Sequence, residues 1–296
     1  MRRREFNTLM GVTAALSALP CAAAALDYPT RPVHWIVGFP PGGATDIIAR
    51  LMGQWLSERL GQSFVIDNRP GAGSNIGTEA VAHAPADGYT LLLISGAQPI
   101  NATLYEHLNY NLVRDIAPVA SISREPNLMV VHPSVPVTTV PEFIAYATAN
   151  PGKLTMASSG NGTIVHISGE MFKMMTGVSM LHVPYRGAGP AVTDLIAGQV
   201  QVMFATMPVP TVAEYVPGYE ATAVYGCGAP KNTPTEIVDK LNHEINAILG
   251  DAKVKARLAD LGGTALAGSP VDYAKLLAET TEKWAKVIRA ANIKVD

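Results

Sequence analysis

Short apolar runs that end in glycine- and proline-rich loops and lead into amphipathic helices recur along this chain. The first run, residues 34–39, is broken by two prolines and two glycines at 40–43, and a helix with apolar residues at helical spacing follows. Thr45 or Asp46 is expected to cap that helix. Strands that alternate with helices in this order are covered on both faces, so the pattern predicts an α/β fold with a doubly wound parallel sheet.

The same alternation begins again near Leu128. Thr139 and Glu142 have the spacing of a capping box at the start of a helix. A polar, glycine-containing loop at 158–163 and a second one at 185–190 each separate a predicted strand from a predicted helix. Two units of this kind in one chain predict two similar lobes.

The predicted domain organisation follows from these two units. Residues 26–124 form the first lobe, residues 125–218 form the second, and residues 219–296 return to the first. The C-terminal third is expected to be mainly helical, with helices at 235–249, 252–261 and 271–290.

The N-terminus has the layout of an export signal. Residues 2–4 are three arginines, residues 9–19 are uncharged and rich in Ala and Leu, and residues 22–25 are four alanines. This layout predicts a signal peptide over 1–25 that is cleaved near Ala25, and hence a periplasmic protein. The paired arginines leave both the Sec and the twin-arginine routes open, and a cytoplasmic helix with a basic start is the alternative.

Charge and cysteine content exclude several classes of protein. Without residues 1–25 the chain has 22 − 3 = 19 basic and 24 − 1 = 23 acidic residues, a net charge of −4, and no stripe of Lys or Arg. We therefore expect no nucleic-acid partner. Cys227 is the only cysteine after the predicted signal peptide, which excludes an intramolecular disulfide and a cysteine metal cluster.

Three of the loops share one design that favours an anion. Loops 39–46, 157–166 and 185–194 each place the start of a helix at the carboxyl end of a strand, where free N–H groups and the helix dipole attract negative charge. The first two loops contain no Lys or Arg, which suits a carboxylate better than a multiply charged phosphate. The alternative is that all three are ordinary strand-to-helix turns.

Signatures of nucleotide binding and catalysis are absent. The first loop lacks the Gly-Lys-Ser/Thr ending of a phosphate loop, and the glycines at 71, 73 and 77 do not fit the dinucleotide fingerprint. The histidines lack metal-ligand spacing. Ser158 and Ser159 have no nucleophile partner that can be recognised from the sequence, and Asp46 is interpreted as a helix-start residue rather than a general base. We therefore expect a protein that is not an enzyme and needs no metal or cofactor.

Seven short motifs are spread over nearly the whole chain after residue 25. They are Tyr28-Pro29-Thr30-Arg31-Pro32, Phe39-Pro40-Pro41-Gly42-Gly43-Ala44-Thr45-Asp46, Asn68-Arg69-Pro70-Gly71-Ala72-Gly73, Asp87-Gly88-Tyr89-Thr90-Leu91, Ala157-Ser158-Ser159-Gly160-Asn161-Gly162-Thr163, His182-Val183-Pro184-Tyr185-Arg186-Gly187 and Thr211-Val212-Ala213-Glu214. Together they resemble the tripartite tricarboxylate receptor family, the Bug or TctC-type solute-binding proteins.

The resemblance implies a type II-like periplasmic-binding-protein fold, in which two lobes close on a small carboxylate held by strand-to-helix loops and ordered waters. The implied function is transport, with a membrane permease of the tripartite tricarboxylate type as partner, and the expected state is a monomer. Carried over by position, the expected ligand-binding residues are Phe39, Pro40, Pro41, Gly42, Gly43, Ala44, Thr45, Asp46, Ser158, Ser159, Gly160, Asn161, Gly162, Thr163, His166, Tyr185, Arg186 and Phe204.

The chain departs from the family pattern in two places. Ala205 and Thr206 stand where the family usually has an acidic or amide pair, and a helix, a strand and a loop that usually follow are missing after Met207. Residues 207–218 would then have to cross between the lobes with three prolines and little strand-forming sequence. The alternatives to a transport receptor are a periplasmic sensor for a signalling partner and a remnant impaired by the deletion.

Overall fold

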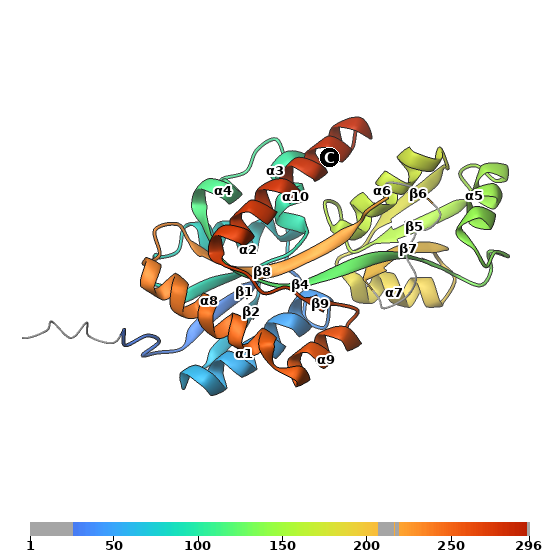
Figure 1. The fold of residues 1–296 in the computed structure, drawn as a ribbon. Helices are drawn as coiled ribbons and strands as arrows, with labels where there is room; N and C mark the ends of the chain where they lie inside the picture. The colour runs from blue at the N-terminus through green and yellow to red at the C-terminus, as the bar shows by residue number, and fades with distance from the viewer. Residues whose placement is uncertain (1–25, 207–215, 217–218, 295–296) are drawn as a thin grey trace, which may run out of the picture.

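The computed structural model describes residues 26–206, 216 and 219–294. The predicted signal peptide therefore lies outside the described residues, as does nearly all of the predicted crossing segment at 207–218. In Figure 1 the chain forms two lobes of strands and helices, with β4 and β8 running from one to the other.

The first lobe is built on three parallel strands. β1 (Val33–Val37) lies between β2 (Phe64–Asn68) and β3 (Thr90–Ile94) and pairs with both in parallel. Helices cover both faces of this sheet, with α1 and α8 on one side and α2, α3 and α10 on the other (Figure 1). The helices are α1 (Ala44–Leu60), α2 (Asn75–Ala82), α3 (Ala97–Leu104), α8 (Thr235–Gly250) and α10 (Pro270–Ala290).

Two antiparallel strands join the lobes. β4 (Ile116–Val131) pairs with β8 (Thr222–Pro230) from Ile116 to Pro126 and then with β7 (Val202–Thr206) from Asn127 onward. β8 also pairs with β3, so it inserts the returning chain into the sheet of the first lobe. The expectation that residues 207–218 supply the crossing element is wrong, because β8 is the paired strand that returns.

β8 was not predicted from the sequence, because most of its residues are small. Gly226 and Gly228 lie where an added Cβ would run into Tyr273 and into Ile94 and Ile116, respectively. The close approach of these neighbours requires glycine. Val224 and Tyr225 are the only large apolar residues of β8, and this strand was not predicted. The three predicted helices of the C-terminal third are confirmed as α8, α9 (Ala252–Asp260) and α10.

The second lobe repeats the first on a smaller scale. β5 lies between β6 and β7 and is parallel to both. The predicted capping box at Thr139 and Glu142 is confirmed at the start of α5. The elements are α5 (Val140–Ala149), β5 (Leu154–Ser158), α6 (Ile164–Thr176), β6 (Met180–Pro184) and α7 (Ala188–Ile196).

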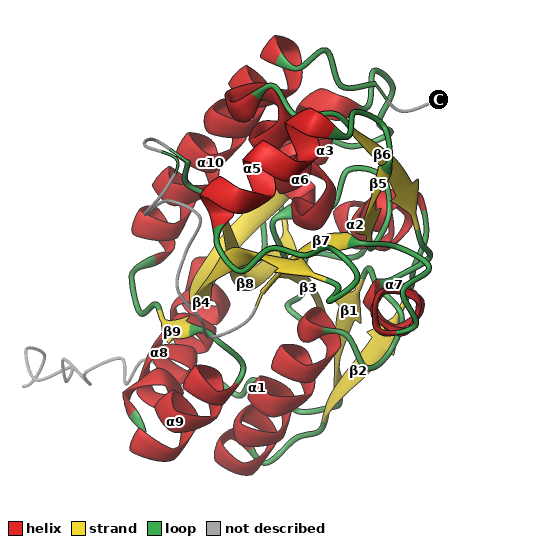
Figure 2. Cartoon of the chain, turned by 90° about the vertical axis from the view of Figure 1, so that its right-hand side faces the viewer, coloured by secondary structure: helices red, strands yellow, loops and turns green. Residues whose placement is uncertain are grey.

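The strands of the described residues follow one path in the order β2-β1-β3-β8-β4-β7-β5-β6. The remaining short elements are η1 (Ala72–Ser74), α4 (Leu112–Asp115), α9 (Ala252–Asp260) and β9 (Thr264–Ala265), which pairs with β4. Figure 2, which views the chain from the side of the second lobe, shows the helices around this central path. Among the described helices, none has the length and apolar character that crossing a bilayer requires.

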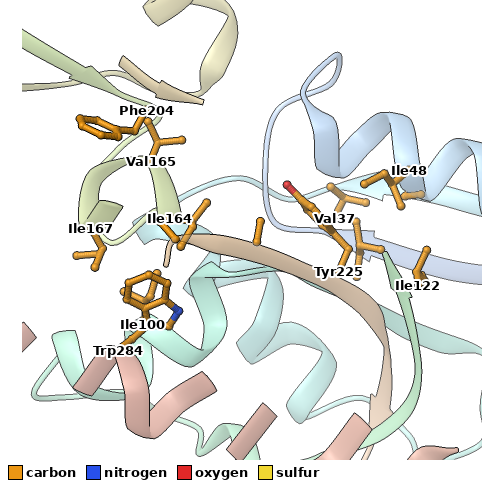
Figure 3. Packing of buried hydrophobic residues seen from close by; sticks show 14 of the residues in the cluster. Val37, Ile48, Ile100, Ile122, Ile164, Val165, Ile167, Phe204, Tyr225 and Trp284 are labelled. Atoms are coloured by element: carbon orange, nitrogen blue, oxygen red, sulfur yellow. The ribbon is translucent and has the colours of Figure 1, made fainter. Parts of the chain in front are cut away.

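Apolar packing continues from one lobe into the other. Figure 3 shows Ile100 of α3 and Trp284 of α10 beside Ile164 and Ile167 of α6, and α10 packs against α6. All four side chains are at least 92% buried and belong to one cluster. The two lobes are therefore in contact through apolar side chains as well as through the crossing strands.

Candidate functional site

A cavity of about 160 Å³ lies between the two lobes, and residues of all three predicted loops line it. Its described lining is Phe39, Pro40, Pro41, Gly43, Ala44, Thr45, Ser95, Gly96, Ala97, Ser159, Thr163, Ile164, Val165, Arg186, Gly187, Ala188, Gly189, Pro190 and Tyr225. We call this the first cavity. Loops 39–46 and 158–163, one from each lobe, therefore face one another across this cavity, as the expected closing of two lobes on one ligand requires.

A second cavity of about 660 Å³ adjoins the first. The two share Phe39, Pro40, Ser159, Arg186 and Gly187, and the second is further lined by residues 70–74, Tyr105, Gly160, Asn161 and Tyr185.

Four helices begin at the first cavity. Its lining includes the N-cap and first-turn residues of α1, of α3, of α6 and of α7, which have their N-caps at Gly43, Gly96, Thr163 and Gly187. The start of each helix carries N–H groups without intrahelical partners and the positive end of the helix dipole. The convergence of four such ends from both lobes makes this cavity favourable for an anion.

Asp46 is hydrogen-bonded to the first loop but does not line either cavity. Its carboxylate accepts from the backbone N–H of Gly42 at 2.9 Å, from Arg50 Nε at 2.9 Å and from Asn68 Nδ2 at 2.9 Å. Although burial alone would raise the pKa of Asp46, the hydrogen bonds from Arg50, Gly42 and Asn68 hold this pKa below its ordinary value. The expectation that Thr45 or Asp46 caps α1 is wrong, since the N-cap is Gly43, which has no side chain to bond.

Two histidines lie under the second loop. The rings of His166 and His182 stack with their centroids 4.0 Å apart and an interplanar angle of 11°. His182 Nε2 lies 2.6 Å from Ser158 Oγ, and Gly162 donates its N–H to His166 Nδ1 at 3.3 Å. Burial, His182 and Lys173 lower the pKa of His166 to about 3, and burial and Lys173 lower that of His182 to about 4.

The contact between Ser158 and His182 lies outside the lining of both cavities. Ser158 is completely buried, and its Oγ is also in contact with the backbone N–H and carbonyl of Gly160, both at 3.2 Å. A hydroxyl in this position bonds its own loop and does not reach the cavity. No group of three His, Cys, Asp or Glu side chains within the described residues is arranged to hold a metal ion.

The third loop, residues 185–194, contributes a positively charged side chain to the site. Arg186 lines both cavities, and no Asp or Glu is among the described residues that line either one. Tyr185 donates its hydroxyl to Asp194 Oδ2 at 2.6 Å, which ties the loop to α7. The lining that the structure describes therefore combines one guanidinium with hydroxyls, backbone and apolar side chains.

The structure brings most of the predicted ligand-binding residues together at the cavities, but not all of them. Gly42, Asp46, Ser158, Gly162 and His166 belong to the loops and helix starts, yet the cavity lining does not include them. Phe204 is also outside the lining: it is fully buried and packs against Phe172 and Tyr219 in the core of the second lobe.

Two elements that line the first cavity were missed by the sequence analysis, as were residues 70–74 and Tyr105 of the second cavity. Residues 95–97 form a further loop between β3 and a helix start, a signal that was readable in the sequence but was overlooked because α3 was not predicted. Tyr225 comes from β8, a strand that was not predicted because most of its residues are small.

Two α/β lobes joined by crossing strands, with helix starts from both lobes around one cavity, define a two-lobed solute-binding protein. Comparison with known proteins gives the family. The profile of the tripartite tricarboxylate transporter family receptor matches residues 48–209 and 206–293, and the chain belongs to this family.

Relatives of known structure and sequence agree with this assignment. A protein encoded in the tcbD-tcbE intergenic region of a Pseudomonas species is 37% identical over 97% of this chain and 94% of its own. A Rhodopseudomonas palustris protein solved with adipate superposes with a TM-score of 0.87 at 38% identity, covering 90% of this chain and 99% of its own. MatC of the same species, solved with malate, has a TM-score of 0.81 at 31% identity, covering 88% and 100%.

The Pseudomonas relative is longer than this chain in its interior. Its alignment extends over 317 positions, whereas this chain has 296 residues, so at least 317 − 296 = 21 positions of the relative have no counterpart here. The family profile also matches in two stretches that meet at residues 206–209.

Proposed function

We propose that this protein is a periplasmic receptor that captures a small carboxylate in the first cavity and delivers it to a membrane permease of the tripartite tricarboxylate type. The observation that carries the proposal is the convergence of four helix starts, from both lobes, on one cavity. Two relatives with the same fold were solved with the dicarboxylates adipate and malate. Export by the N-terminal signal, the monomeric state and the absence of catalysis belong to the same proposal.

The geometry supports recognition of the carboxylate by backbone N–H groups. Gly43, Thr163 and Gly187 place the first N–H groups of α1, α6 and α7 at the cavity, and Arg186 adds one positive charge at its edge. Since α1 and α6 belong to different lobes, an anion between them stabilises the closed arrangement over an open one.

The charges of the lining also bear on selectivity. The described lining has no carboxylate that could pair with an ammonium group, and an unpaired charge in a cavity is unfavourable. Glutarate should therefore bind more tightly than glutamate, which differs from it by one ammonium group. Tighter binding of glutamate would show that an acidic group outside the described lining completes the site.

The site is tested by filling the cavity. Gly43 has φ −85° and ψ 169°, a conformation that valine adopts easily, and an added Cβ meets nothing within 4 Å. Gly43→Val should fold normally but weaken adipate, malate or glutarate binding by tenfold or more in calorimetry. Gly250→Val is the matched control, because Gly250 also has open space around an added Cβ and lies at the end of α8. Equal affinities in the two variants would refute the site.

We place the missing interior stretch of the chain at residues 206–209, where the two stretches of the family match meet. Its loss should lower the stability and the affinity of the receptor if the stretch contains the helix and the strand that the family resemblance implies. The experiment inserts the corresponding segment of the Pseudomonas relative after Met207. A melting temperature and an adipate affinity equal to those of the natural chain would show that the shorter chain is complete.

A further inference from the structure

The second loop presents some residues to the cavities and hides others. Ser159 and Thr163 line the first cavity, whereas Ser158 and Gly162 are behind it. The two hidden residues are the ones that contact the stacked histidines, Ser158 through its hydroxyl and Gly162 through its N–H.

The contacts of Ser158 Oγ determine what His182 does. Gly160 N–H points to this oxygen at 3.2 Å, the oxygen lies 3.2 Å from Gly160 O, and His182 Nε2 is 2.6 Å away. A serine hydroxyl has one proton and two lone pairs. All three contacts are satisfied together when His182 donates Nε2–H to Oγ and Oγ donates to Gly160 O.

The partner of His166 determines its tautomer in the same way. Gly162 N–H donates to His166 Nδ1, so Nδ1 carries no proton. The proton then lies on Nε2, which faces Glu170 Oε1 at 3.9 Å, and Glu170 is held in turn by Lys173 at 2.9 Å. A proton added to Nδ1 would place two donors against each other at Gly162.

We propose that His166 and His182 are positioning residues for ligand binding, which fix the second loop at its two hidden ends so that Ser159 and Thr163 face the first cavity. The inference rests on the proposed binding of a carboxylate in that cavity. The rings support one another by stacking, and both are neutral at neutral pH because burial lowers the pKa of each. Neither ring is among the residues that line the cavities.

The two histidines use different ring nitrogens, and this difference makes a crossed test possible. Asparagine places its amide oxygen near the position of His Nδ1, and glutamine places its amide near the position of His Nε2. His166→Asn should therefore keep the acceptor for Gly162, and His182→Gln should keep the donor for Ser158. His166→Gln and His182→Asn remove the same ring and lose the contact.

Two measurements on these four variants test the proposal. Calorimetry with adipate should give affinities within about threefold of the natural protein for His166→Asn and His182→Gln, and about tenfold weaker for His166→Gln and His182→Asn, the loss expected for one hydrogen bond. Amide hydrogen exchange of Gly162, measured without ligand, should be faster in His166→Gln than in His166→Asn. Equal effects of Asn and Gln at each position would overturn the positioning role.

Failure of the proposed function is distinguishable from failure of this inference. If the natural protein binds none of adipate, malate and glutarate, the proposed function fails, while the exchange of Gly162 still reports whether His166 holds the loop. The ¹⁵N shifts of the imidazoles in the natural protein give an independent result that needs no variant. They should show an unprotonated Nδ1 in His166 and a protonated Nε2 in His182, and the opposite tautomers would overturn the assignment.

Discussion

Gly162 is one of the points at which the second loop touches the first lobe, and alanine at this position should separate closure from folding. Gly162 has φ +76°, and an added Cβ would lie 2.5 Å from Asn101 Oδ1 and 2.9 Å from Leu104 Cδ2, both on α3. Asn101 is fully buried and its amide donates to Gly73 O at 2.7 Å and to Asn75 Oδ1 at 2.8 Å, so it is not free to move aside.

Two unfavourable terms follow from Gly162→Ala, and they act on different equilibria. The left-handed conformation is unfavourable for alanine by about 1–2 kcal/mol whether or not the lobes touch. The overlap with α3 is worth about 1–3 kcal/mol, typical of overpacking, but it disappears when the lobes move apart. The first term therefore lowers the free energy of unfolding, while the second lowers carboxylate affinity by roughly five- to 150-fold.

Gly152→Ala is the matched control for the strain term. Gly152 has φ +73°, and an added Cβ there meets nothing within 4 Å. Urea unfolding should give the two variants similar losses of stability, whereas calorimetry with adipate should show weaker binding only for Gly162→Ala. The reasoning is refuted if both variants bind adipate as tightly as the natural protein, or if Gly162→Ala is several kcal/mol less stable than Gly152→Ala.

Three further predictions concern acid stability, the first loop and the crossing strand. Because the pKa values of His166 and His182 are about 3 and about 4 in the folded protein and 6.5 is the ordinary value, the unfolded chain binds more protons below pH 6.5. The contribution of the two neutral histidines to the free energy of unfolding should be fully present above pH 6.5 and fall toward pH 4 by about 1.4 kcal/mol per pH unit for each histidine. Urea titrations should show a shallower fall in the double variant His166→Asn/His182→Gln. An unchanged slope in that variant would contradict this. Asp46→Ala should lower the free energy of unfolding by about 1.5–3 kcal/mol, because Gly42 and Asn68 lose a charged acceptor. Asp46→Asn should recover part of the lost stability. An unchanged free energy of urea unfolding in Asp46→Ala would count against these hydrogen bonds. Gly226→Ala should be destabilising by about 1–3 kcal/mol, because the added Cβ would lie 2.6 Å from Ala120 O and against the Tyr273 ring. Gly250→Ala should leave the melting temperature nearly unchanged. Equal melting temperatures of the two variants would argue against the packing of β8.

The sequence by itself determined the repeating units and the loops that carry the site. The alternation of strand, loop and helix is a local pattern, since apolar spacing and glycine or proline breaks act over a few residues. The capping box at Thr139 and Glu142 and the approximate bounds of α8, α9 and α10 were predictable for the same reason. Placing loops 39–46 and 158–163 at the carboxyl ends of parallel strands was enough to predict that they line a cavity.

Only the tertiary structure decided which distant groups meet behind those loops. His182 reaches Ser158 because β6 pairs with β5 in a register that places Ser158 opposite Pro184, and no local pattern encodes this register. Phe204 packs against Phe172 in the core because both faces of β7 are buried, so no alternation of apolar and polar residues indicates which face lies nearer the cavity. β8 is a strand because β3 and β4 bond its backbone on both sides. The absence of side chains at Gly226 and Gly228 permits this close packing, but two glycines do not by themselves predict a strand.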